Sequence, residues 1–375
     1  MCDRSVLPPA GASTSIRQIA RSPLQFLHAR NGVPLPVTGS SSPTADEGSA
    51  VFVEGLDSPR GLAFGPDGCL YVAEGGRGGT QSTVADCPQI PPPIGPYQGG
   101  MTARISKVDP SGARTTVIDG LPSSRSATGH VSGVADVAFV DGRLYALEAG
   151  AGCSHGLAGT ANGIYRVERD GTWSLVADLG AFLRANPVAC PDPEDDEYDG
   201  TWYGLCAVDG ALYAVEPNHG EVDRMDPDGA VSRLVDISAS YGHCVPTAIA
   251  HDGALLVGNL GRLPLVPGSS QILEIALDGR ILGRRTGGFT AILGLALDDR
   301  GRLCVLENTA RDEPGRLAPG TGRVVRLSED GARETLAAGL ASPTGMTFGP
   351  DGALYVSTHG FGPPGAGTIL RLRAG

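Results

Sequence analysis

A glutamate recurs at one position of a repeated segment and is the first candidate for chemistry in this chain. The segment reads PDGCLYVAEGG at residues 66–76, and variants of it return at 140–150, 208–218, 251–261, 299–309 and 350–360. The equivalent position is occupied in chain order by Glu74, Glu148, Glu216, Asn259, Glu307 and Thr358. Carboxylates that converge on one axis repel each other, so they would need a hard cation such as Ca²⁺ or Mg²⁺. This interpretation makes candidate metal ligands of Glu74, Glu148, Asn259 and Glu307.

A structural role explains the same repetition more simply. A residue that returns in every unit of a repeat usually meets a need that every unit has. Here the need is hydrogen bonding, because a carboxylate at the end of a strand can accept bonds from the backbone of the next loop. We favour this interpretation, and the metal site stays open as the alternative.

Histidines supply the candidate general bases. The segment EPNHG brings an acid, an amide and an imidazole together as Glu216, Asn218 and His219. His243 and His359 lie in similar irregular segments. Imidazole titrates near neutral pH and therefore suits proton transfer. We predict as catalytic residues His219, His243, His359 and Glu216, with Asn218 binding substrate; for each histidine the alternative is a loop residue that only bonds a carbonyl.

A second group of candidates lies where the first strand of a unit begins, because there the sequence does not repeat. Arg60, in the segment SPRG, offers paired N–H donors to an anion, and Asp136 offers a base or a metal ligand. Trp202 and Tyr203 offer flat apolar surfaces with one polar atom each. We predict that these four residues bind substrate.

The elements that position these residues are short strands in a repeat. Each copy of the first segment has a turn followed by alternating apolar residues, and a hairpin-like phrase such as ISKVDPSGARTTVIDGL follows it. The turns are Asp67-Gly68, Asp141-Gly142, Asp209-Gly210, Asp252-Gly253, Arg300-Gly301 and Asp351-Gly352. This pattern predicts an all-β fold, a six-bladed β-propeller of four-stranded antiparallel blades.

The two ends of the chain differ in character. The last unit lacks a fourth strand, and SAVFVEGLDSPRG near the beginning reads like the missing one. We expect this N-terminal strand to close the last blade, which leaves no sheet edge open. The propeller then covers residues 50–375. Residues 1–49 are rich in Ser, Pro, Ala and Arg and are expected to be a disordered tail or an unprocessed leader.

The predicted connections divide unevenly between the two faces of the propeller. On one face every turn is minimal, as in GPDG and ERDG, and we call it the plain face. The other, the decorated face, carries the long connections 75–102, 121–134, 149–162, 181–202, 238–246, 260–270 and 308–321. Long irregular loops on a rigid scaffold suggest binding or catalysis, although propellers also tolerate such loops without using them.

Charge and composition narrow the set of partners. The formal net charge is -12 and no cluster of Lys and Arg interrupts it, so a nucleic-acid partner is not expected. No run of 18 apolar residues occurs, so membrane insertion is not expected either. We expect a monomer that binds a small molecule or a protein on the decorated face and uses no nucleotide cofactor.

The cysteines bear on the compartment. Cys87, Cys153, Cys190 and Cys244 fall in predicted loops, where three pairings are open. Loop disulfides favour an extracellular or periplasmic location. The given sequence shows no signal peptide, so a cytoplasmic location stays open.

The repeats resemble NHL-type repeats, and longer phrases resemble the ScyD/ScyE family, named after a cyanobacterial sunscreen-pigment cluster. The phrases that carry this resemblance are SPRGLAFGPDGCLYVAEGG, YGLCAVDGALYAVE, VPTAIAHDGALLVGNLGRLPLVPGSSQILEI and GGFTAILGLALDDRGRLCVLE. The resemblance covers roughly residues 50–373 and implies a six-bladed propeller, often secreted, without a settled reaction.

Two enzyme families with propeller folds are similar in part. Virginiamycin-B-type lyases have a glutamate after the second strand of most blades, but their WFTE aromatics are missing here and Pro246-Thr247 occupies their histidine position. Gluconolactonase-type propellers carry a metal-binding glutamate where this chain has SPRG. Two hypotheses follow. One is a metal-assisted lyase or hydrolase of secondary metabolism, with a histidine base; the other is a secreted propeller that binds a ligand or protein without turnover.

Overall fold

The computed structural model describes residues 49–311, 313–328 and 330–373, which form one compact unit. The expectation of a tail or leader at residues 1–49 falls outside the described residues, apart from Ser49. The described chain is almost entirely β-structure, with two short helices. The predicted all-β class is confirmed.

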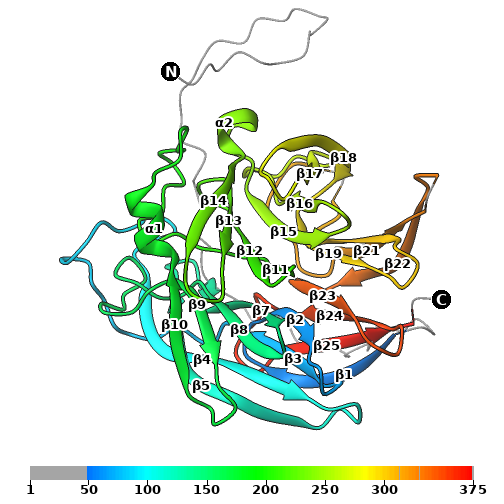
Figure 1. The fold of residues 1–375 in the computed structure, drawn as a ribbon, viewed down its shortest axis with the longest axis horizontal. Coiled ribbons are helices and arrows are strands. Elements are labelled where there is room, and N and C mark those ends of the chain that lie inside the picture. Colours follow the sequence, from blue (N-terminus) through cyan, green and yellow to red (C-terminus); the bar gives the residue numbers. More distant parts are fainter. Residues whose placement is uncertain (1–48, 312, 329, 374–375) are drawn as a thin grey trace, which may run out of the picture. The chain divides into compact units, whose positions relative to one another are not determined.

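Six antiparallel sheets are arranged around a common centre as the blades of a propeller (Figure 1). The innermost strands are β2 (Pro59–Phe64), β7 (Val134–Val140), β11 (Leu205–Val208), β15 (Pro246–His251), β19 (Ile292–Leu297) and β23 (Gly345–Phe348). The second strands are β3 (Leu70–Glu74), β8 (Arg143–Glu148), β12 (Ala211–Glu216), β16 (Leu255–Asn259), β20 (Leu303–Glu307) and β24 (Leu354–Thr358). The third strands are β4 (Gln98–Val108), β9 (Gly163–Val167), β13 (Glu221–Met225), β17 (Ser270–Ile275), β21 (Gly322–Leu327) and β25 (Gly367–Leu372).

The outermost strands are β5 (Arg114–Arg125), β10 (Trp173–Asp178), β14 (Val231–Asp236), β18 (Ile281–Phe289), β22 (Arg333–Leu340) and β1 (Ser49–Leu56). Five sheets have four strands, as predicted. The first blade departs from the prediction because a two-residue strand, β6 (Val131–Ser132), pairs with the end of β5 and makes it five-stranded. This extra strand lies within the long connection that leads to the second blade.

The N-terminal strand closes the ring as the sequence predicted. β1 pairs antiparallel with β25 along its length, from Ser49 opposite Leu372 to Leu56 opposite Gly367. Leu56 is fully buried and belongs to a cluster that also contains Leu70 and Tyr355, from the first and last blades. The first and last blades are therefore joined by backbone hydrogen bonds and by a shared core.

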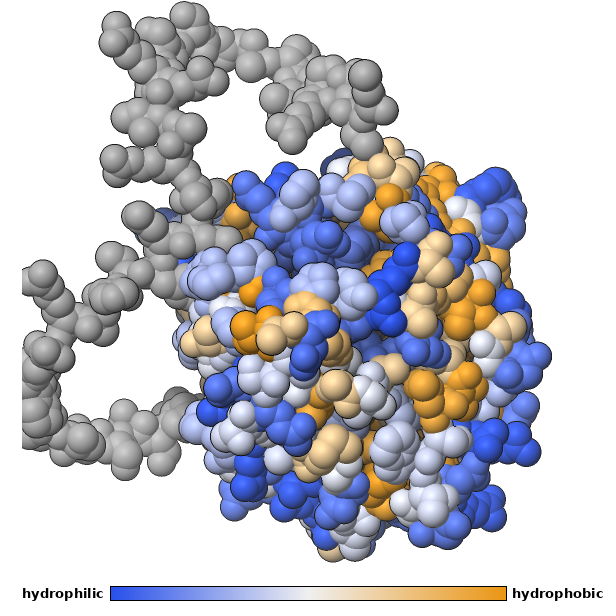
Figure 2. Space-filling model, turned by 90° about the vertical axis from the view of Figure 1, so that its left-hand side faces the viewer, coloured by the Kyte–Doolittle hydropathy of each residue, from blue (hydrophilic) through white to orange (hydrophobic). Residues whose placement is uncertain are grey.

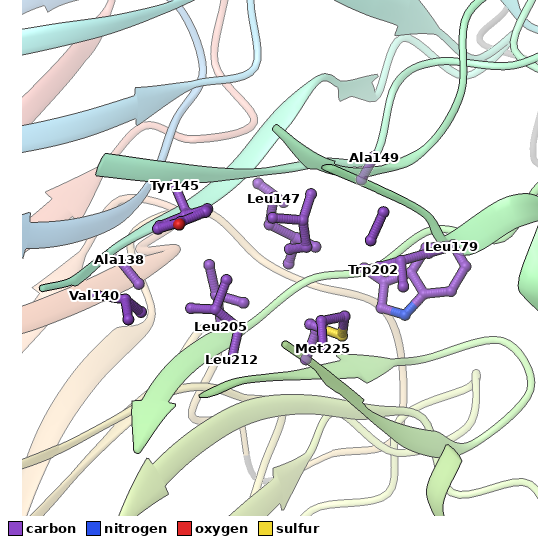
Figure 3. Close-up of a cluster of buried hydrophobic side chains, with 14 of the residues drawn as sticks. Ala138, Val140, Tyr145, Leu147, Ala149, Leu179, Trp202, Leu205, Leu212 and Met225 are labelled. Carbon is purple, nitrogen blue, oxygen red and sulfur yellow. The ribbon is translucent and has the colours of Figure 1, made fainter. Parts of the chain in front are cut away.

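The hydrophobic core is divided into layers between neighbouring blades. In a strand, alternate side chains point to opposite faces, so each blade has two faces to bury. One layer joins the second and third blades and contains Leu147, Leu179, Trp202, Leu212 and Met225 (Figure 3). Burial of these apolar side chains on both faces of each sheet stabilises the stack of blades.

Two helices follow outermost strands. α1 (Leu179–Ala185) begins after β10, and the side chain of Asp178 accepts a hydrogen bond from the Ala181 N–H at 2.7 Å, which caps it. α2 (Ser238–Tyr241) begins after β14. No helix of the described residues has the length and apolar character needed to cross a bilayer. On the side drawn in Figure 2, apolar residues are scattered among hydrophilic ones.

The closing strand gives a direct test of the ring. Leu56→Ala removes a fully buried side chain from the joint between the first and last blades, so it should lower the free energy of unfolding by about 2–5 kcal/mol. Urea denaturation at equilibrium measures this change. Val51→Ala is the matched control in the same strand, because Val51 is 58% exposed; an equal loss in both variants would contradict a closing role for β1.

Candidate functional site

The innermost strands of all six blades line a central channel of about 500 Å³. Most of its lining side chains are apolar, such as those of Leu62, Val137, Ile249 and Met346. Asp136 is the one carboxylate among the described residues that line it. A channel with one acidic group makes this residue the natural starting point for a functional site.

Strand pairing shows that Asp136 stands where each of the other five blades has a small residue. The residue two before each repeated acid pairs with an inner-strand residue, and these partners are Leu62, Val137, Leu205, Ile249, Leu295 and Met346. The residues that precede these partners are Gly61, Asp136, Gly204, Ala248, Gly294 and Gly345. Five blades therefore present glycine or alanine at the level where the second blade presents a carboxylate.

The absence of side chains in this layer makes room for the carboxylate. A Cβ atom on Gly61 would lie 1.8 Å from Asp136 Oδ1, so any larger residue at position 61 would displace it. The two oxygens of Asp136 accept hydrogen bonds from the N–H groups of Val137 and Leu205, both at 2.8 Å. Burial outweighs these bonds and raises the pKa of Asp136 to about 7.

The layer above Asp136, toward the decorated face, contains Arg60, Ala135, Tyr203, Thr247, Leu293 and Thr344. We call this set the mouth ring. The Tyr203 hydroxyl donates a hydrogen bond across the ring to the Thr344 carbonyl at 3.2 Å, from the third blade to the sixth. The tyrosine thus spans the decorated end of the channel. Leu62 and Val137 hold equivalent positions in the strand pairing, so Asp136 is the counterpart of Gly61. It therefore lies one layer deeper than its grouping with Arg60 in the sequence analysis implied.

Arg60 is buried at the mouth ring without an acidic partner. Its residue exposure is 6%, and one guanidinium nitrogen donates to the Val131 carbonyl. Its guanidinium carbon lies 4.6 Å from the ring centroid of Phe361 and 5.8 Å from that of Tyr203. No carboxylate of the described residues lies within 4.0 Å of it. Arg60 is therefore a positive charge held by one carbonyl and two aromatic rings.

Trp202 does not take part in this site. The residue is fully buried, with an accessible fraction of 0%, and its ring packs beside Leu179 and Met225 (Figure 3). The indole Nε1–H donates to Asp223 Oδ2 at 3.0 Å. The prediction that Trp202 forms a wall for substrate is wrong, because the residue turns into the layer between two blades while its neighbour Tyr203 faces the channel.

Other predicted residues gather around an acidic loop, residues 192–199 (DPEDDEYD), on the decorated face. Three consecutive acids of this loop each meet a histidine from another segment. His243 Nε2 lies 2.9 Å from Asp195, His219 Nε2 lies 2.8 Å from Asp196, and His155 Nε2 lies 3.1 Å from Glu197. Asn218 donates to Asp195 at 2.9 Å. The structure thus brings His219, His243 and Asn218 together through a loop that the sequence analysis did not connect with them.

His219 is held between two carboxylates. Its Nδ1 lies 3.0 Å from Glu216, and Asp196 occupies the other ring nitrogen. Burial would lower the pKa of His219, but Glu216 and Asp196 outweigh it and raise the pKa to about 10. An imidazole that keeps its proton at neutral pH does not accept another, so this geometry favours an ion-pair role for His219 over that of a general base.

His359 lies apart from both groups. Its backbone has a φ of 58°, and its N–H donates to the Ala341 carbonyl at 2.6 Å. Its side chain contacts Thr358, with Nδ1 3.4 Å from the hydroxyl oxygen. The structure therefore does not join His359 to Asp136, Arg60 or the acidic loop.

The repeated acids accept hydrogen bonds from the loop that enters their own blade. Glu74 accepts from the Asp57 N–H at 2.6 Å, Glu216 from the Thr201 N–H at 2.9 Å and Glu307 from the Thr290 N–H at 2.6 Å. Cations compensate these three acids, and their partners are Arg104 for Glu74, His219 for Glu216 and Arg323 for Glu307. These are the bonds expected of a residue with a structural role in each blade.

The same residues do not fit a shared cation. Asn259 uses both amide atoms on backbone groups, accepting from Gln271 N–H and donating to the Cys244 carbonyl. The oxygens of Glu74 and Glu307 are bound by arginine and backbone N–H. Within residues 49–311, 313–328 and 330–373 no three His, Cys, Asp or Glu side chains are grouped so as to hold a metal. We derive no step of the chemistry through a metal.

Glu148 differs from the other repeated acids because it has no cation. Its Oε1 accepts from the N–H groups of Ala149 and Gly150, while its buried Oε2 has no hydrogen-bond partner. The cross-strand neighbour is Gly163, where Glu74 and Glu307 face Arg104 and Arg323. Burial raises the pKa of Glu148 to about 8, against the effect of the two N–H groups. The side chain is therefore mostly neutral at pH 7.

One of the predicted loop disulfides forms. Cys87 and Cys153 are bonded, which ties the long loop of the first blade to that of the second. Cys244 carries a free thiol, so the complementary pair of Cys190 with Cys244 does not form. Cys69, Cys206 and Cys304 are also free thiols.

Comparison with known proteins places the fold in the class of six-bladed β-propellers. No protein-family model matches the chain, and no curated protein sequence matches it. Among solved structures, a glucose dehydrogenase aligns over 87% of this chain and 99% of its own, with 17% identity and a TM-score of 0.53. A gluconolactonase from Xanthomonas campestris aligns over 86% and 89%, with 16% identity and a TM-score of 0.51. At these identities the likeness shows the fold alone, and the ScyD/ScyE family stays a proposal.

Sequence reasoning found Arg60, Asp136 and Tyr203 but missed Phe361. The phenylalanine lies in HGFGPPGAG, a loop too rich in glycine and proline to show periodicity. His130, a decorated-face histidine outside the predicted catalytic set, lies against it with ring centroids 5.4 Å apart and a tilt of 39° between the ring planes. Large aromatic residues in an irregular loop were the available signal, since aromatics are few in this chain at 5%.

Glu148 has no cationic partner and a raised pKa, so we expect the stability of the protein to depend on pH. The folded-state pKa, about 8, exceeds the usual 4.5, so the native state holds an extra proton between these values and loses stability as pH rises through them. Glu148→Gln removes this loss, at about 1.4 kcal/mol per pKa unit. We expect the variant to gain stability relative to the parent protein between pH 6 and pH 9 in urea denaturation.

Glu307→Gln is the matched control, because it removes an acid that is paired with Arg323. We expect it to destabilise the protein at both pH values, since it leaves a partly buried arginine without its acid. A Glu148→Gln variant that loses stability relative to the parent protein as pH rises would show that Glu148 is already ionised.

Proposed function

We propose that this protein binds a small organic molecule at the decorated end of its central channel and acts on it as a lyase or hydrolase. Asp136 accepts a proton from the substrate or from water, and Arg60 and Tyr203 hold the substrate at the mouth ring. The observation that carries the proposal is the lone carboxylate in a layer of glycine and alanine, with a pKa raised by burial to about 7. A base works best when its pKa is near the working pH.

The geometry supports a chemical role for Asp136 over a structural one. A structural residue of a repeat is expected in most units, as the glutamate slot shows. An acid occurs at this level in one blade only, and Asp136 has no cation partner within 4.0 Å. Burial disfavours its ionised form and so raises its pKa. Five blades maintain the fold with glycine or alanine at this level, so the acid is not a general requirement of a blade.

Support from related proteins is at the level of the fold. The structural neighbours include proteins described as gluconolactonase and glucose dehydrogenase, which act on small molecules by name. The phrases shared with the ScyD/ScyE family support membership in that group and a place in secondary metabolism. The disulfide between Cys87 and Cys153 supports an oxidising compartment, outside the cytoplasm.

The second candidate function is ligand binding without turnover. It is favoured by the ion pairs of His219 and His243, because both of these predicted bases are engaged by carboxylates. In this case Arg60 and Tyr203 still bind the ligand, and Asp136 contributes only its charge. The two functions are separated by the effect of Asp136 on turnover.

Asp136→Ala tests the proposal with little risk to the fold, because Ala248 occupies the same level of the fourth blade. The kcat/KM for hydrolysis of a panel of small lactones and esters, measured by the release of protons, should fall by about 10²–10⁴ in this variant. For the parent protein, kcat/KM should rise with pH through about 7 as Asp136 loses its proton.

The matched control is Cys206→Ser, since Cys206 also lines the channel. It should keep kcat/KM within a factor of about two to three, as expected for a change that touches no reacting group. An Asp136→Ala protein with unchanged kcat/KM, or a pH profile that is flat around 7, would rule out Asp136 as the base.

A further inference from the structure

Arg60 carries a positive charge that the described protein does not neutralise. The residue is 6% exposed, Nη2 donates to the Val131 carbonyl, and the guanidinium also interacts with the Tyr203 hydroxyl. A guanidinium has five N–H donors in a fixed fork. The remaining donors are not among the fully buried atoms that lack a partner, so they keep some access to the surface. The other donors of this largely buried cation are thus available to a ligand.

The backbone of Arg60 is fixed by the neighbouring blade. Ser357 Oγ donates to the Arg60 carbonyl at 2.7 Å, and Thr344 Oγ1 donates to the preceding carbonyl, of Pro59, at 2.6 Å. Both donors belong to the sixth blade. The arginine is therefore held at its base in advance of binding, which reduces the entropy lost when a ligand is ordered against it.

Aromatic rings surround the guanidinium. The guanidinium carbon lies 4.6 Å from the ring centroid of Phe361 and 5.8 Å from that of Tyr203, and the His130 ring lies tilted against Phe361. Burial lowers the pKa of His130, and the charge of Arg60 lowers it further, so the imidazole is neutral at pH 7 and competes with no anion for the arginine. The surface beside the charge is flat and apolar.

This combination fits one class of ligand. A carboxylate accepts two parallel N–H bonds from an arginine fork, which a neutral hydroxyl cannot do. Aromatic rings on either side add offset or edge contacts to a flat ring in the ligand. The protein as a whole is acidic, with a formal net charge of -12, so a ligand with several negative charges would be repelled more strongly than one with a single carboxylate.

We propose that Arg60, Phe361 and Tyr203 form a binding site for a planar aromatic monocarboxylate. The proposal rests on the proposed function, since it names the substrate class of the same channel mouth. The carboxylate pairs with Arg60, the ring lies against Phe361 and Tyr203, and the reacting part of the molecule points toward Asp136, one layer below.

Benzoate is a suitable probe, with phenol as the uncharged analogue. Isothermal titration calorimetry on the full chain, at constant ionic strength, should show saturable binding of benzoate and binding of phenol that is at least about tenfold weaker, as for the loss of a hydrogen bond to a charged group. Arg60→Gln should weaken benzoate binding by a similar factor. The matched control is Arg311→Gln, because Arg311 is exposed in a decorated-face loop, and it should bind benzoate like the parent protein.

Equal affinity for phenol and benzoate, or an Arg60→Gln protein that binds benzoate as the parent does, would overturn the proposal. A second measurement uses the parent protein and does not depend on the folding of Arg60→Gln. Benzoate should raise the pKa of His130, followed by NMR of the imidazole and assigned with a His130→Gln variant, because the anion offsets the charge of Arg60. An unchanged pKa of His130 at saturating benzoate would count against the site.

Asp136→Ala separates this site from the proposed chemistry, because it leaves Arg60 and Phe361 in place. Retained benzoate binding with lost turnover supports both the site and the base. Absent benzoate binding, in a parent protein whose turnover depends on Asp136, overturns the carboxylate site alone. Benzoate binding with turnover that is indifferent to Asp136 overturns the base and leaves the carboxylate site in place.

Discussion

The pairing of β1 with β25 is the interaction on which the rest of this structure depends. A propeller is closed only when its last blade is completed, and here the completing strand comes from the beginning of the described chain. β1 ends at Leu56 and β2 begins at Pro59, so the strand that closes the sixth blade leads directly into the first strand of the first blade. Arg60 is the second residue of that strand, and two side chains of the sixth blade bind the carbonyls of Pro59 and Arg60. The blade that β1 completes therefore also positions Arg60.

Repetition and its exceptions divide structural from chemical roles in this chain. The repeated glutamates bond the loop that enters their own blade and are paired with cations in three of four cases, Glu148 being the exception. The level of Asp136 shows the reverse pattern, because five blades have a small residue and one has a carboxylate. A site in a symmetric scaffold needs such an exception, since identical blades would present identical groups to the axis.

The acidic loop shows how net charge is managed on the decorated face. Three of its acids meet His243, His219 and His155, and others pair with Arg262 and Arg184. These pairs bind the loop to segments of neighbouring blades, and the Cys87–Cys153 bond ties two further loops. The decorated face is thus held in one arrangement around the mouth ring, which suits a site that must position a small molecule.

The sequence by itself determined the six blades, the closing strand and the decorated face, because strand alternation, turns and repeats are local patterns that each unit shows in full. It also named Arg60, Asp136 and Tyr203, since they break the repeat. Only the tertiary structure decided that Asp136 lies one layer below Arg60, because the turn between the first and second strands differs in length between these two blades and counting back from the repeated acid does not give the level. It likewise turned Trp202 into the core, joined the histidines to the acidic loop and brought Phe361 over Arg60, 301 positions away in a chain of 375 residues. Such contacts arise where blades meet, and no pattern within a single blade specifies them.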